Sequence, residues 1–173
     1  MSVFNFDAES RHQHYMERYK TGEVNSLDSF IVQLEERLVV NLSRTKSLTK
    51  RSNITAALKR IQNDTLELLT EYTTQLGIDL EDFSEAEARF VTATLAKDIE
   101  RDEFVVPALN QLRAAANARP FTTKLLKDEL KDFPLQQAKL IRNTVTLGIA
   151  EGKSNAEIVK DILGTSELKF KDG

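Results

Sequence analysis

The sequence predicts an all-α protein with long amphipathic helices in an elongated helical bundle or hairpin arrangement, about seven helices in all. Three observations lead to this class. The chain has only 6 glycines and 3 prolines among 173 residues, so few points interrupt regular structure. Apolar residues recur at helical spacing along most of it. Charged residues make up 29% of the chain, as expected of helices with one solvated face.

The first long helix is expected to begin near Asp7, a residue type that caps helix starts, and to end near Leu42. Glycine destabilises a helix interior by about 1 kcal/mol relative to alanine. The segment is therefore one helix, or two helices interrupted at Thr21–Gly22. Its apolar positions are Tyr15, Tyr19, Leu27, Phe30, Ile31, Leu34, Leu38 and Leu42.

Residues Ser43–Asn53 lose this periodicity and predict a loop. Ser52 or Asn53 can cap a second helix that is expected to stop at Gly77, and the two helices are predicted to form an antiparallel hairpin. A third helix is expected to open at a capping box, in which Ser84 and Glu87 each satisfy the other's backbone amide.

Four shorter helices are expected to follow. Their starts and stops come from proline, glycine and a second capping box. The predicted helices are Ala108–Asn117 between Pro107 and Pro120, Thr122–Lys131 before Phe133–Pro134, Leu135–Glu151 before Gly152, and a last helix from the Ser154–Glu157 capping box through Leu163 to Gly164. We expect a first region at 1–103 and a second at 104–173.

The residues after Gly164 alternate polar and apolar types and end on Asp172–Gly173, a hairpin-turn dipeptide. A chain that closes on a turn signal predicts the amino-terminal portion of a longer polypeptide, or a polypeptide cut at a domain junction.

Basic residues concentrate in one part of the chain. Between Leu38 and Asn63 there are six Lys or Arg residues and no acid. We expect this set to contact DNA phosphates without reading sequence, because no aromatic residues are interleaved to stack on bases. An acidic surface of a partner, or of the chain's own third helix, is the open alternative. The set is Arg44, Lys46, Lys50, Arg51, Lys59 and Arg60.

A second candidate surface is the apolar stripe of the first helix. Amphipathic stripes must be buried, either inside one fold or against partner helices. The predicted partner-helix face consists of Leu27, Ile31, Leu34, Leu38 and Leu42.

No catalytic, cofactor or metal site is predicted, and we expect no enzyme activity and no membrane segment. The chain has no cysteine, and His12 and His14 lie about 200° apart on a helix, so they cannot chelate one metal together. Gly152-Lys153-Ser154 lacks the spacing of a phosphate loop and fits a helix–loop–helix connection. The carboxylates Asp79, Glu81, Asp82, Glu100, Asp102 and Glu103 are expected near loops and helix starts, where they complement helix dipoles.

Leu140–Gly173 resembles the minor head proteins of the Mu F-like head-morphogenesis family of tailed phages. The matching pattern is a helix with two glycines four residues apart, a Ser-opened helix containing Ile-Val, then Gly-Thr and Asp-Gly. Arg11–Leu27 also looks like the opening helix of such proteins. The residues that carry the pattern are Gly148, Gly152, Ser154, Ile158, Val159, Gly164, Thr165, Asp172 and Gly173.

This resemblance implies a low-copy structural protein of the capsid interior, made in the host cytoplasm. It implies association with the portal or other capsid proteins in a multimeric assembly, a role in head assembly or DNA packaging and delivery, and in some cases ejection with the DNA. The alternatives are the helical adaptor region of a virion-carried effector or enzyme, and a cellular helical regulator that dimerises through the Leu27–Leu42 stripe.

Overall fold

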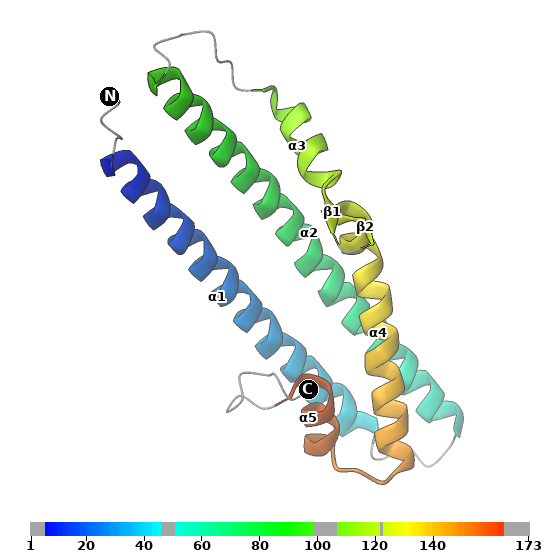
Figure 1. The fold of residues 1–173 in the computed structure, drawn as a ribbon. Coiled ribbons are helices and arrows are strands. Elements are labelled where there is room, and N and C mark those ends of the chain that lie inside the picture. The colour runs from blue at the N-terminus through cyan, green and yellow to red at the C-terminus, as the bar shows by residue number, and fades with distance from the viewer. Residues whose placement is uncertain (1–5, 46–50, 99–106, 122, 165–173) are drawn as a thin grey trace. The chain divides into compact units, whose positions relative to one another are not determined.

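The computed structural model describes residues 6–45, 51–98, 107–121 and 123–164, and it confirms the all-α prediction. Five helices occur in these ranges, where about seven were expected for the chain (Figure 1). They are α1 Phe6–Thr45, α2 Arg51–Asp98, α3 Leu109–Asn117, α4 Leu126–Ala150 and α5 Asn155–Leu163. Two short strands, β1 Pro120–Phe121 and β2 Lys124–Leu125, pair antiparallel between α3 and α4.

The predicted stop at Gly77 and the predicted helix start at Ser84 are both wrong, because α2 runs unbroken through them. The Ser84 hydroxyl donates to the Leu80 carbonyl at 2.8 Å, which is how a serine inside a helix satisfies its side chain. α1 likewise continues through Gly22 without a break. A glycine costs a helix only about 1 kcal/mol, so continued packing outweighs the local signal.

The predicted fifth and sixth helices are also one element. α4 contains Pro134 in its interior, although proline removes a backbone hydrogen bond and costs a helix about 3 kcal/mol. Pro134 is buried, so packing of its ring offsets part of that cost. At the other connection, α1 reaches Thr45 and α2 begins at Arg51, which places Ser52 and Asn53 inside the first turn rather than before it.

The predicted helix start at Thr122 is wrong, because strand β2 occupies Lys124–Leu125 and α4 begins at Leu126. The predicted boundaries of α3 and α5 agree closely with the structure. α3 ends at Asn117 and α5 ends at Leu163, as expected from the following Pro120 and Gly164. Gly152 and Gly164 both have positive φ angles, 73° and 75°, the conformation for which helix ends select glycine. The expected polar–apolar tail with its Asp172–Gly173 turn lies outside the described residues.

The chain divides into two compact units, and α1, α2 and α4 contribute to both. Unit 1 comprises 1–26 and 74–130, and unit 2 comprises 27–73 and 131–173. Each unit therefore combines segments from both sides of the expected boundary at residue 103.

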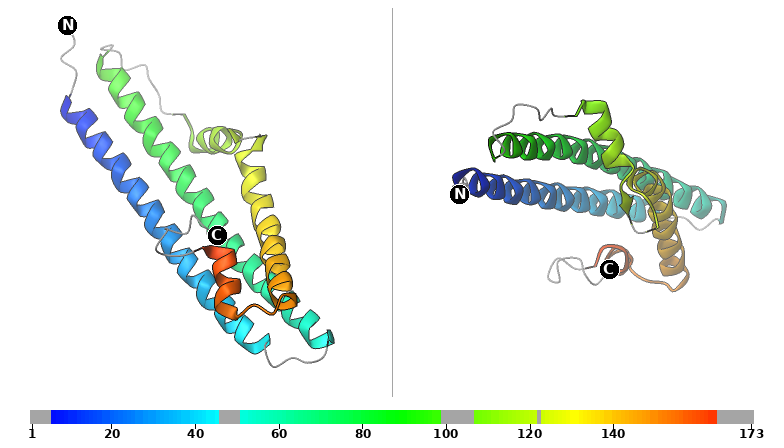
Figure 2. Two further views of the ribbon diagram at one scale, coloured as in Figure 1. Left: turned by 60° about the horizontal axis from the view of Figure 1, so that its bottom comes forward. Right: turned by 45° about the horizontal axis from the view of Figure 1, so that its top comes forward.

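Unit 2 holds a close-packed core to which four helices contribute. Its α1 and α2 segments run antiparallel, since Phe30 stacks on Tyr72 at 4.6 Å between ring centroids and the Asn41 amide donates to Asp64 at 3.0 Å. α5 turns back beside α4 (Figure 2). The core cluster is Leu34, Leu38, Leu42, Leu58, Ile61, Leu68, Ile141, Val145, Ile158 and Val159.

Gly148 makes the contact between α4 and α5 close. A Cβ atom at this position would lie 2.5 Å from Cγ1 of Ile158, a side chain that is only 1% exposed. This agrees with the sequence-based interpretation that Gly148 accommodates one bulky neighbour. The small residue thus sets how near α5 can approach.

Unit 1 is packed differently. Its α1 and α2 segments are also antiparallel, with His12 stacked on Phe90 at 3.7 Å and Tyr19 against Phe83 at 4.5 Å between ring centroids. Among the residues of unit 1 that the structure describes, none is fully buried. The buried apolar side chains of the described ranges all belong to unit 2.

Candidate functional site

A pocket lies where α1 ends and α2 begins, within unit 2. It is lined by Asn41, Arg44, Asn53, Ala56, Ala57 and Arg60, and its volume is ≈ 210 Å³. We call it the basic pocket. Two arginines from different helices meet there because the antiparallel pairing brings the last turns of α1 beside the first turns of α2.

The two asparagines of the basic pocket have different roles. The Asn41 side chain is 8% exposed, and its amide nitrogen donates to the Asp64 carboxylate, which ties α1 to α2. The amide oxygen of Asn53 accepts a 3.5 Å hydrogen bond from the Ser52 hydroxyl, so its amide nitrogen is the donor that remains for other groups.

The predicted basic set is thereby only partly brought together. Arg44 and Arg60 line the basic pocket and Lys59 does not, although all three residues are exposed. Lys46 and Lys50 lie outside the described residues, as does the side chain of Arg51. Sequence reasoning missed Asn41 and Asn53, because uncharged amides give no charge signal and join the arginines only through helix pairing.

The predicted partner-helix face lies mostly inside unit 2. Leu34, Leu38 and Leu42 belong to the core cluster, with exposures of 4%, 1% and 1%. Helices α2, α4 and α5 of the same chain therefore already cover this part of the stripe. Ile31 is half-buried, and Leu27 is 40% exposed.

Exposed apolar side chains instead follow one side of α4. Phe133, Leu140 and Leu147 are 40%, 57% and 58% exposed, and they are spaced by seven residues, which is two helical turns. We call these three residues the α4 stripe. The positions between them on that side, Gln136, Gln137, Asn143 and Thr144, are uncharged, and Glu129 and Glu151 lie beside the two ends of the row. The seven-residue spacing could have identified this stripe from the sequence.

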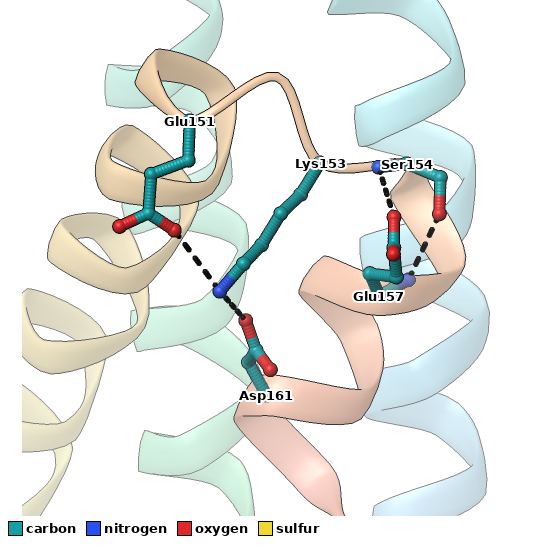
Figure 3. A network of polar contacts seen from close by, with 5 residues as sticks. All are labelled: Glu151, Lys153, Ser154, Glu157 and Asp161. Carbon is teal, nitrogen blue, oxygen red and sulfur yellow. Dashed lines mark hydrogen bonds and ion pairs between the residues drawn. The ribbon is translucent and has the colours of Figure 1, made fainter.

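The remaining candidate groups make structural contacts. The Lys153 ammonium lies 3.0 Å from a carboxylate oxygen of Glu151 and 2.8 Å from one of Asp161, and these hydrogen bonds, chiefly the one to Asp161, raise its pKa (Figure 3). The Ser154 oxygen accepts the Glu157 amide at 3.2 Å, and hydrogen bonds from Ser154 lower the pKa of Glu157. Gly152-Lys153-Ser154 thus forms a helix–loop–helix connection.

The acidic residues singled out in the sequence do not lie at helix starts where the structure describes them. Asp79, Glu81 and Asp82 are inside α2, so that prediction is wrong for them. Arg113 and Asn117 of α3 bind the Glu81 carboxylate at 3.1 and 2.9 Å, which fastens α3 to α2 in unit 1. Glu100, Asp102 and Glu103 lie outside the described residues.

The two histidines also lie in unit 1. The Nε2 atom of His12 is 3.2 Å from a Glu87 carboxylate oxygen, and His14 is exposed. Within the described ranges, no three His, Asp or Glu side chains converge as metal ligands would. None of the helices in those same ranges has the length and apolarity to cross a bilayer.

No protein-family model, curated protein or solved structure matches the chain.

Proposed function

We propose that this chain is a structural component of a tailed-phage virion, an internal or portal-associated minor head protein that acts in capsid assembly or DNA packaging and delivery. It has no catalytic role in this proposal. The resemblance of Leu140–Gly173 to the Mu F-like head-morphogenesis family suggests the setting. The α4 stripe is the observation that carries the proposal, because it provides a surface for a protein partner.

The core of unit 2 is complete without the stripe. Ala138, Ile141 and Val145 of α4 are buried in unit 2, so Leu140 and Leu147 are not required to complete that core. Exposed apolar rows at heptad spacing pack against similar rows on another helix. Since the stripe itself and the positions between its residues carry no charge, the proposed occupant is an apolar helix of a portal or capsid subunit.

The test is incorporation into particles. In the phage that encodes the chain, L140E/L147E places two charges in the proposed interface, and we expect at least a tenfold loss of the protein from purified particles, measured by quantitative mass spectrometry. L135E is the matched control. Leu135 is also 58% exposed, but it lies about 140° around the helix from Leu140 at about 100° per residue.

Equal incorporation of both variants would show that the α4 stripe is not the docking surface. Absence of the wild-type protein from purified particles would overturn the virion assignment itself. A stable dimer in infected or uninfected cells would then favour a cellular dimerising regulator. Cross-linking within particles would identify the neighbour of α4.

A further inference from the structure

The basic pocket has the composition of an anion site. It combines two guanidinium groups and an amide donor in one cavity of ≈ 210 Å³, far above the roughly 15 Å³ that a single water needs. A phosphate group therefore fits with part of its hydration shell. Guanidinium groups suit this ligand, because their planar fork donates two parallel hydrogen bonds to phosphate oxygens.

The charge around the pocket supports the same ligand. Between Leu38 and Asn63 the chain has no carboxylate. The nearest acid in sequence, Asp64, accepts a hydrogen bond from Asn41. No ion pair between Arg60 and a carboxylate occurs among the described residues. Binding of an anion at Arg60 thus does not require a described salt bridge to break.

We propose that Arg44, Arg60 and the amide of Asn53 form a phosphate-binding pocket that holds one backbone phosphate of double-stranded DNA. This inference rests on the proposed function, since that function places the chain beside packaged DNA. Donors from two helices line the cavity, so a bound phosphate can accept hydrogen bonds from both. The pocket contains no aromatic side chain, so binding is independent of base sequence.

Lys59 allows a direct phosphate contact in the pocket to be distinguished from long-range attraction by positive charge. Lys59 precedes Arg60 in α2, carries the same charge and is exposed, yet it lies outside the pocket. Loss of Lys59 should weaken DNA binding only through long-range attraction. Loss of Arg44 or Arg60 should remove a direct phosphate contact.

The experiment measures binding of the full chain to a fluorescently labelled, random-sequence 25-base-pair DNA by anisotropy at several salt concentrations. The variants are R44Q, R60Q, the double variant R44Q/R60Q and K59Q, and circular dichroism checks that each is folded. We expect R44Q and R60Q each to weaken binding about tenfold, as loss of a charged hydrogen bond does, and to lower the salt slope by about 0.9. K59Q should weaken it less than about threefold. Inorganic phosphate should compete with the wild type and fail to compete with R44Q/R60Q.

Equal losses of DNA affinity in K59Q and R60Q would overturn the proposed phosphate pocket, because diffuse positive charge would then account for the binding. Preferential binding of polyglutamate, with no competition by phosphate, would overturn it in favour of an acidic protein partner. These results are separate from the particle assay. If R44Q/R60Q loses DNA binding but the wild-type chain is absent from virions, the pocket is supported and the virion function is wrong. If the wild-type chain is incorporated normally but binds no DNA, the virion function is supported and the pocket is wrong.

Discussion

At the residue scale, Gly148 and Gly22 both lie inside helices, but one is closely packed and the other has open space beside it. Gly148 has Cγ1 of the buried Ile158 where its Cβ would be, whereas nothing lies within 4 Å of the equivalent point at Gly22. The same substitution should therefore change stability in opposite directions.

We expect G22A to raise the free energy of unfolding by about 0.5–1 kcal/mol, because alanine favours the helix and meets no atom. G148A should lower it by about 1 kcal/mol, since overpacking against a side chain that cannot move aside outweighs the helix gain. Urea denaturation of the two variants checks this pair. A stabilised G148A would mean that α5 does not approach α4 as closely as described.

A second residue-scale effect concerns Glu23 in unit 1. Burial raises the pKa of the Glu23 carboxyl, and the nearby Asp79 raises it further. The folded state therefore holds its proton to higher pH than the unfolded state does. The contribution to stability falls as the pH rises from the ordinary carboxyl value, 4.5, through the raised one.

E23Q removes this titration. We expect the variant to be more stable than the wild type at pH 7 by about 0.5 kcal/mol, a modest value because solvent screens half-buried carboxylates. The difference should vanish at pH 4, where Glu23 is largely protonated. D79N should change stability in the same direction. Thermal unfolding at the two pH values provides the measurement, and an E23Q advantage that persists at pH 4 would contradict the assignment.

At the element scale, the two Ser-x-x-Glu motifs predicted as helix caps adopt different structures. Ser154 and Glu157 exchange hydrogen bonds at the start of α5, while Ser84 lies inside α2 and donates to Leu80. S154A should destabilise the protein by about 1 kcal/mol, and S84A should be neutral within about 0.5 kcal/mol. Chemical denaturation of both variants tests the contrast. A costly S84A would indicate a helix boundary near that residue.

These motifs show what could be predicted from the sequence and why the rest could not. The ends of α3 and α5 were predictable because local groups determine them, such as the Ser154 cap and the positive φ of Gly164. The continuity of α2 and α4 was not, since it depends on packing that outweighs Gly77 and Pro134. Likewise, six basic residues spread over 44–60 did not indicate that Arg44 and Arg60 share a pocket that Lys59 does not line.

The two units should also differ in how often they open. Unit 1 has no fully buried side chain among its described residues, whereas the core of unit 2 includes Leu38 at 1% and Val145 at 0% exposure. Local opening is less costly where few apolar contacts are lost. We expect amides of residues 10–24 to exchange at least about tenfold faster than those of 34–42 in the same helix. Uniform protection along α1 would contradict this difference.

At the scale of the whole molecule, the proposed contacts use different parts of unit 2 and can be separated. The α4 stripe is apolar and uncharged, so protein docking through it should change little with salt. Phosphate binding at the basic pocket should weaken as salt rises. Raising salt from 50 to 200 mM should therefore weaken DNA binding by about three- to tenfold while cross-links through α4 persist. Simultaneous loss of both would indicate one shared electrostatic surface.

The core of unit 2 has a consequence for how the chain is made. Ile158 lies in the same core cluster as Leu58, a residue that leaves the ribosome 100 positions earlier. At roughly 5–20 residues per second, that interval lasts about 5–20 s. During this time α5 does not yet cover the apolar inner side of the nascent 27–73 hairpin. Chaperones or a neighbouring nascent chain can therefore bind this apolar surface before α5 emerges.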